Sequence, residues 1–121
     1  MRAIRGWRVL VLVGGFMAAL PAQAAERRCG WYMNPTTGNH LFIDRDGMWV
    51  MAEQRGCQAP GLDDLPDLDT GEWVRGESAG GHGCACLSLE VDRASRRVTR
   101  IVSGEAMPLA QCRADPALPR L

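Results

Sequence analysis

The sequence predicts an all-β domain, either a small antiparallel sheet or a partly open barrel, built from hairpins and stapled by disulfides. Three observations support this fold class. Short segments of alternating apolar and polar residues are separated by turn residues, and no helical period longer than a turn or two occurs after residue 24. The chain has only 121 residues and carries five cysteines. A domain of this size has a modest core, so covalent cross-links add substantially to its stability.

The N-terminal segment predicts a secretory signal peptide over residues 1–24 that is cleaved after Ala24. A basic region with Arg2, Arg5 and Arg8 precedes an apolar stretch over residues 9–20, and Ala-Gln-Ala at 22–24 matches a cleavage site. The apolar stretch has about a dozen residues, whereas a membrane span needs roughly 20. We therefore expect one domain over residues 25–121, periplasmic or secreted by a bacterium, with no membrane span after processing.

The charge composition excludes several function classes. The chain has 14 Lys+Arg and 14 Asp+Glu residues, and cleavage removes three arginines and no acidic residue, which leaves a net charge of −3. This balance lacks the basic excess that nucleic-acid binding requires. The chain contains no lysine, so Schiff-base and P-loop chemistry have no residue to perform them.

The strands follow from turn residues and alternation, in chain order. The first predicted strand covers residues 29–33 and ends at Asn34-Pro35, because proline interrupts strand pairing. Segments 40–44 and 48–53 flank Asp44-Arg45-Asp46-Gly47, whose Asp and Gly suit the ends of a tight hairpin turn. The later part of the domain predicts a short strand at 72–75, a second hairpin from 84–92 and 97–103 through the turn at 93–96, and one helical turn at 108–112.

The five cysteines lie in the predicted exported part of the chain, where oxidising conditions favour disulfides. Alternation places Cys84 and Cys86 on the side of their strand that points away from the buried one. Neighbours at i and i+2 do not bridge each other easily, so we expect each to bond with a terminal cysteine. The bridge candidates are Cys29, Cys84, Cys86 and Cys112, with the pairing left open, and Cys57 is either a small buried residue or a surface thiol capable of making a dimer.

Several short motifs occur in an order that resembles a bacterial family called domain of unknown function 4087. These motifs are Cys29-Gly30-Trp31, Asn34-Pro35-Thr36, Asp44-Arg45-Asp46-Gly47 with Trp49, Gly83-Cys84-Ala85-Cys86, and Pro108-Leu109 before Cys112. The resemblance implies a small exported protein of proteobacterial type whose shared cysteines match Cys29, Cys84, Cys86 and Cys112. The family has no established activity, so the resemblance transfers no catalytic residue. Cys57, His40 and His82 depart from the family pattern.

Two groups of residues are candidates for binding a partner. An acidic stretch, interrupted by proline and glycine, indicates a solvated loop or a docking face for a basic protein. Tryptophans could stack on a partner or on sugar rings, although in a small domain they are more often part of the core. The partner-binding candidates are Asp63, Asp64, Asp67, Asp69 and Glu72 in the acidic stretch, with Trp31, Trp49 and Trp73.

The favoured function is an exported, non-enzymatic binding or envelope-maintenance protein, in one version an inhibitor of a basic envelope-attacking enzyme such as a lysozyme. We expect no catalytic residue and no cofactor, and the expected partner is a basic protein or a cell-wall component. One alternative is a periplasmic metal-binding or thiol-redox protein that uses His82, Cys84 and Cys86. Another alternative is a cell-wall carbohydrate-binding module.

Overall fold

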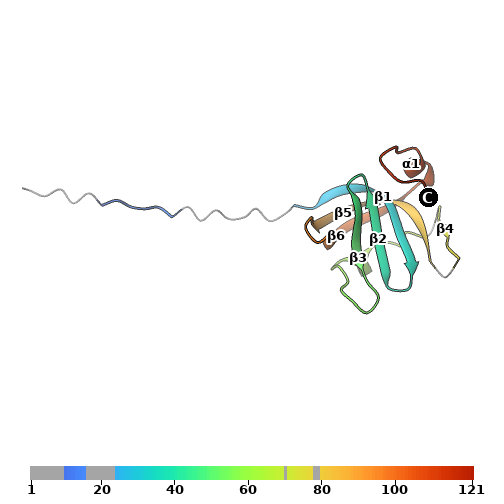
Figure 1. Ribbon diagram of the computed structural model, residues 1–121, viewed down its shortest axis with the longest axis horizontal. Coiled ribbons are helices and arrows are strands. Elements are labelled where there is room, and N and C mark those ends of the chain that lie inside the picture. Colours follow the sequence, from blue (N-terminus) through green and yellow to red (C-terminus); the bar gives the residue numbers. More distant parts are fainter. Residues whose placement is uncertain (1–9, 16–23, 70, 78–79) are drawn as a thin grey trace, which may run out of the picture.

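The computed structural model describes residues 10–15, 24–69, 71–77 and 80–121. The predicted signal peptide falls largely outside these ranges, which leave out residues 1–9 and 16–23. Within the described ranges, no helix is long and apolar enough to cross a membrane. The β domain begins at Glu26 and continues to the end of the chain (Figure 1).

The described residues form mostly β structure, which confirms the predicted fold class. The strands are β1 (Glu26–Thr36), β2 (Asn39–Asp44), β3 (Gly47–Ala52), β4 (Val74–Arg75), β5 (Gly81–Asp92) and β6 (Arg97–Met107). Two short helical segments accompany them: the 3-10 turn η1 (Leu62–Asp64) and the helix α1 (Leu109–Arg113).

The six strands form one sheet that closes into a ring (Figure 1). Their order is β1-β2-β3-β6-β5-β4, and β1 also pairs with β5. All these pairings are antiparallel except that of β3 with β6, which meet as a parallel pair at Val50 and Arg97. The Val50 amide donates a hydrogen bond to the Arg96 carbonyl oxygen at 2.9 Å. The sheet is therefore mixed, because this contact joins strands that are far apart in the sequence.

The two predicted hairpins are confirmed. Asp44 pairs with Gly47 across the first turn, where Gly47 has a φ of 111° that favours glycine. The Asp46 amide donates to the Asp44 carboxylate at 2.8 Å, which is typical of an aspartate at the start of a turn. In the second hairpin, Asp92 pairs with Arg97. Local turn chemistry is sufficient to define both hairpins.

Two predicted strand ends are wrong. β1 continues through Asn34-Pro35 to Thr36, and its register with β2 is irregular between Met33 and Thr36. This irregularity accommodates the amide that proline lacks. β6 runs to Met107, beyond the predicted end at residue 103, because Met107 still pairs with Cys84 of β5.

The main core lies between the strands of the ring, and β5 is its central element. The predicted inner side of β5 is confirmed, since Ala85, Leu87, Leu89 and Val91 are all buried there. They pack with residues from the other strands and from the loop before β4. The largest of these partners are Tyr32, Phe42, Trp49, Met51 and Ile101.

A second, smaller core covers the opposite side of β5, so Cys84 and Cys86 do not face solvent. Both residues are 2% exposed. The residues that form this second core are Trp31, Cys84, Leu109, Cys112 and Leu118. The Trp31 indole donates to the Pro119 carbonyl oxygen at 3.0 Å, which helps to hold the C-terminal segment over the sheet. The sequence reveals only the alternation of β5, because the residues that cover its second face come from the end of the chain.

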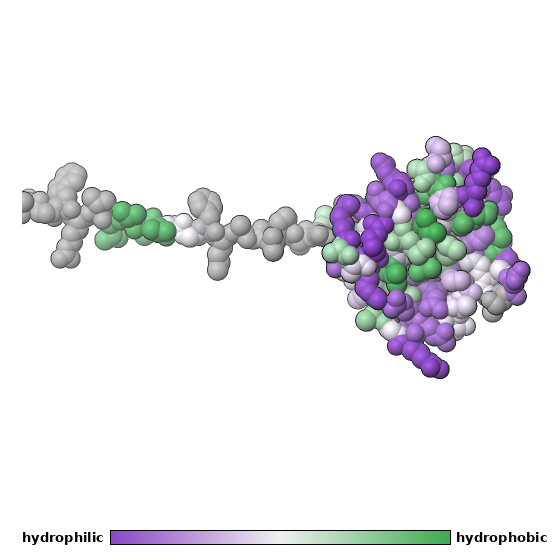
Figure 2. Space-filling view, in the orientation of Figure 1, coloured by the Kyte–Doolittle hydropathy of each residue, from purple (hydrophilic) through white to green (hydrophobic). Residues whose placement is uncertain are grey.

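The outer face of β2 and β3 is apolar. Leu41, Ile43 and Val50 are half-buried on this face, and Met48 is 48% exposed. Leu41 pairs with Val50 and Ile43 with Met48, so these side chains are neighbours. Figure 2 shows apolar surface in the middle of this view, over the strands β1 to β3, with polar side chains around it.

Candidate functional site

A surface cleft of about 320 Å³ lies where the acidic loop (residues 60–69 and 71–73) meets strands β1 and β2. Asp63, Asp67 and Asp69 line this cleft, and all three residues are exposed. η1 begins at Leu62 after Gly61, which has a φ of 95°. Here an alanine Cβ would lie only 1.9 Å from the Ile101 carbonyl oxygen, so the close contact with β6 requires glycine at the start of the loop.

Aromatic rings form the opposite wall of the cleft. Tyr32 from β1, His40 from β2 and the half-buried Trp73 all line it. The Tyr32 and Trp73 ring centroids are 6.0 Å apart, and the Tyr32 hydroxyl lies 2.5 Å from His40 Nδ1. The cleft thus combines aromatic surface with acidic side chains.

The titratable groups of the aromatic wall are neutral at pH 7. Burial raises the pKa of Tyr32 to about 12, and the charge of Asp69 acts in the same direction. Burial also lowers the pKa of His40, although the nearby Asp63 opposes this effect. A neutral His40 accepts at Nδ1, so the Tyr32 hydroxyl donates this hydrogen bond.

Acidification from pH 7.5 to 5.5 is expected to destabilise the protein through its two histidines. Burial lowers the pKa of His40, and burial together with Arg113 lowers the pKa of His82. The unfolded chain takes up protons near its ordinary pKa of about 6.5, whereas the folded chain resists protonation. The stabilising contribution is therefore complete above this pKa and is lost as the pH falls towards the lowered folded values.

Urea unfolding at the two pH values, measured by circular dichroism, tests this dependence. The wild type is expected to lose more free energy of unfolding on acidification than either His40→Gln or His82→Gln, and the double variant is expected to lose least. Equal losses in all four proteins would show that the histidines do not cause the pH dependence.

Two of the three candidate tryptophans do not offer a stacking surface. Trp31 is 1% exposed and Trp49 is 0% exposed, so their predicted role in binding a partner is wrong. Trp49 lies between two guanidinium groups, with Arg28 at 4.8 Å and Arg96 at 3.9 Å from its ring centroid. Only Trp73 of the three reaches the cleft.

The acidic stretch is divided between two environments. Glu72 turns towards α1, where its carboxylate accepts a hydrogen bond from the Leu109 amide at 3.3 Å. Asp64 is exposed but does not line the cleft. The structure therefore brings together Asp63, Asp67 and Asp69, and it separates them from Glu72.

The four candidate cysteines form two bridges, Cys29–Cys86 and Cys84–Cys112. Each terminal cysteine is thus joined to one cysteine of β5. The proposed metal site of His82, Cys84 and Cys86 is wrong, because both thiolates that it requires are used in disulfides. His82 instead lies edge-on to Trp31, with ring centroids 5.4 Å apart. Cys57 is a free, exposed cysteine, so the surface-thiol alternative is the correct one.

Tyr32 and Asn34 also line the cleft and are not among the candidates from the sequence. No short-range pattern connects them to the acidic loop, because the loop follows β1 at a distance of about thirty residues and reaches it only through the ring of strands. The useful signal would have been a polar-tipped aromatic residue within the predicted first strand.

The fold and the disulfides define a class of protein. Two disulfides in a small β domain indicate an oxidising, extracytoplasmic location. The protein is thus a small, disulfide-stapled β protein of such a compartment. A family model described as "Protein of unknown function (DUF4087)" matches residues 23–119, and the chain belongs to this family. Neither a curated protein nor a solved structure matches the chain.

Proposed function

We propose that this protein is an exported, non-enzymatic binding protein whose acidic cleft holds basic side chains of a protein partner. The observation that carries the proposal is the combination of Asp63, Asp67 and Asp69 with Trp73 and Tyr32 around one cleft. Carboxylates form charge-assisted hydrogen bonds with guanidinium and ammonium groups. An aromatic face next to them adds cation–π attraction.

The partner that fits this chemistry best is a basic enzyme that attacks the bacterial envelope, such as a lysozyme. An inhibitor of such an enzyme acts outside the cytoplasm, which agrees with the disulfides and with the export expected from residues 1–24. Clustered carboxylates accelerate and orient the encounter with a basic protein. In this role the protein maintains the envelope without catalysing a reaction.

The outer face of β2 and β3 favours a protein partner over a polysaccharide. Its half-buried and exposed apolar residues, with polar surface around them, are typical of protein interaction sites. A carbohydrate-binding module requires accessible rings, and of the three candidate tryptophans only Trp73 is accessible. The carbohydrate alternative is therefore the weaker proposal.

Binding of the full chain to a basic lysozyme at micromolar concentration tests the proposal. We expect complex formation by calorimetry and slower lysis of cell walls, both weakened by added salt because exposed charges are screened. Replacing Asp63, Asp67 and Asp69 by Asn is expected to weaken binding about tenfold, since each exposed ion pair contributes roughly 0.2–1 kcal/mol.

The matched control replaces Glu77, Glu90 and Glu105 by Gln, which changes the net charge equally but leaves the cleft lining intact. This control is expected to bind nearly as well as the wild type. Equal weakening by both triple variants would show that net charge, and not the cleft, drives binding. Failure of the wild type to bind or to slow any basic lysozyme would overturn the proposal.

A further inference from the structure

The two disulfides have different surroundings. Cys84, Cys86 and Cys112 are each 2% exposed, whereas Cys29 is half-buried. Cys29 also borders a surface cleft of about 530 Å³ that contains charged side chains such as Arg27 and Arg93. An external thiol therefore has its most direct access to the Cys29–Cys86 bond at Cys29.

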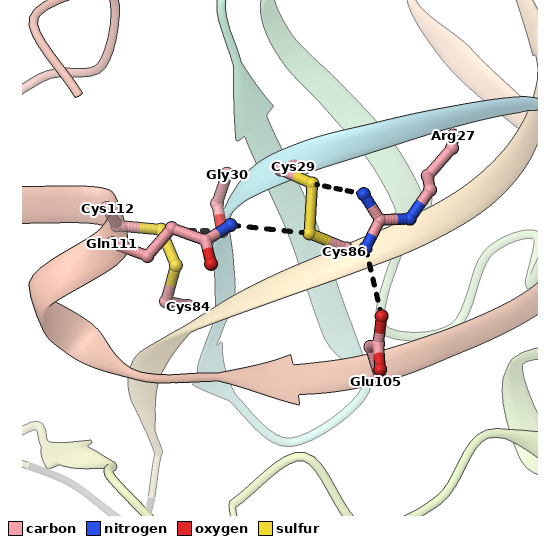
Figure 3. The surroundings of a disulfide bond; sticks show 8 residues. All are labelled: Arg27, Cys29, Gly30, Cys84, Cys86, Glu105, Gln111 and Cys112. Atoms are coloured by element: carbon pink, nitrogen blue, oxygen red, sulfur yellow. Dashed lines mark hydrogen bonds and ion pairs between the residues drawn. A yellow bond between two sulfur atoms is a disulfide. The ribbon is translucent and has the colours of Figure 1, made fainter.

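Polar donors lie at both sulfurs of the Cys29–Cys86 bond (Figure 3). The Arg27 guanidinium lies 3.5 Å from Cys29 Sγ, and the Gln111 side-chain amide lies 3.5 Å from Cys86 Sγ. In the other bond, Cys112 Sγ lies 3.2 Å from the carbonyl oxygen of Gly30. A positive charge and an N–H donor stabilise a thiolate, whereas a carbonyl oxygen repels one.

We propose that Cys29–Cys86 is a redox-active disulfide that exchanges with an external dithiol, and that Cys84–Cys112 is a purely structural bond. Cys29 is the sulfur that is attacked. Arg27 attracts the incoming thiolate, and Gln111 stabilises the thiolate that leaves at Cys86. This activity is independent of the acidic cleft, which none of these residues lines.

The exchange proceeds in two balanced steps. A thiolate of the donor attacks Cys29 Sγ, a donor–Cys29 bond forms, the Cys29–Cys86 bond breaks, and its electron pair leaves on Cys86. The second donor thiolate then attacks the donor sulfur of this mixed disulfide and expels Cys29 as a thiolate. The donor dithiol is oxidised to a disulfide, and its two protons finally reside on Cys29 and Cys86.

The sheet keeps the two thiols together after reduction. Cys29 and Cys86 are directly opposed in the antiparallel pairing of β1 with β5, with Cα atoms 4.0 Å apart. This pairing extends from Glu26 with Leu89 to Asn34 with Gly81, and β1 also pairs with β2. Backbone hydrogen bonds on both edges of β1 therefore hold its position without the disulfide. The reduced pair remains poised to form the bond again.

Short exposure to reduced glutathione identifies the sulfur that is attacked. The test uses the full chain with Cys57→Ser, which removes the exposed free thiol. After an acid quench and alkylation, peptide mass mapping locates each glutathione adduct and each newly alkylated cysteine. We expect the adduct on Cys29, alkylation on Cys86, and formation at least about tenfold faster than any adduct on Cys84 or Cys112.

Matched variants test the role of Arg27, which also forms an exposed ion pair with Glu105 at 2.9 Å. Arg27→Gln is expected to slow the adduct about fivefold through the loss of one charge near the sulfur. Glu105→Gln removes the same ion pair but retains the guanidinium, so it should not slow the reaction. Equal slowing by both variants, or adducts that appear first on any cysteine other than Cys29, would overturn the proposal. Because only the first attack is measured, the result does not depend on whether the reduced protein stays folded.

Discussion

Replacing Asp44 by Ala is expected to lower the free energy of unfolding by about 3–5 kcal/mol, because it leaves a buried arginine without its main partner. The Asp44 side chain is 2% exposed and that of Arg28 is 5% exposed, and their charged groups are 2.9 Å apart. Such a pair is costly to break even where its net contribution to stability is small, since the remaining charge stays in a poorly solvated environment.

Asp44 also holds polar groups of the hairpin in place. One of its oxygens accepts hydrogen bonds from the Asp46 amide at 2.8 Å and from the Trp49 indole at 3.0 Å. Burial acts to lower the pKa of Arg28, but hydrogen bonds to Asp44 and Asp46 outweigh it, so the guanidinium keeps its charge. Within the described part of the chain, Arg28 Nε has no hydrogen-bond partner. The arginine therefore depends on its carboxylates.

Urea unfolding at pH 7, followed by circular dichroism, measures the effect of this substitution. Asp44→Asn retains an acceptor for Trp49 and should cost less, about 1–3 kcal/mol. The control Glu53→Gln breaks an exposed ion pair with Arg97, whose side chains are 48% and 42% exposed, and should change the stability by less than about 1 kcal/mol. A similarly small effect of Asp44→Ala would contradict the importance of the buried pair.

Removing the Cys84–Cys112 bridge is expected to have the second large effect, a loss of about 3.5 kcal/mol for the double variant Cys84→Ser, Cys112→Ser. The bridge closes a loop with a sequence separation of 28 and thereby restricts the unfolded chain. It also attaches α1 to β5. A helix of five residues is too short to be stable alone, so its position depends on this bond and on the second core.

Loss of this bridge should expose Trp31, which is 1% exposed in the intact protein. The expected results are a lower urea midpoint, a red-shifted tryptophan emission before global unfolding, and faster proteolysis after residue 107. Cys57→Ser is the control, because this cysteine is exposed and unpaired, and it should alter the stability by no more than about 0.5 kcal/mol. Unchanged emission and proteolysis would show that the C-terminal segment stays in place without the bond.

The predictable parts of this fold are those that depend on neighbours in the sequence. Both hairpins follow from turn residues such as Asp44 and Gly47, and the inner side of β5 follows from its alternation. The set of bridged cysteines follows from their placement, but the choice of partner does not. Cys29 bonds to Cys86 because β1 and β5 pair in a register that depends on the whole sheet.

The candidate site shows the same division. The acidic loop is visible in the sequence, but the aromatic wall of the cleft comes from β1 and β2. The tryptophans show why residue type alone is insufficient: Trp31 and Trp49 are buried by segments far along the chain, and Trp73 is not. Pro35 stays within β1 because the register of β1 with β2 is irregular near it.

By itself, the sequence determined the β class, the two hairpins, the apolar side of β5 and the four cysteines that pair. These features depend on turn geometry and on the two-residue period of a strand, which act over a few residues. Only the tertiary structure decided the closure of the ring, the second core under α1, the disulfide partners and the position of the cleft. Each of these depends on contacts between distant segments, whose stability is set by the packing of the whole domain.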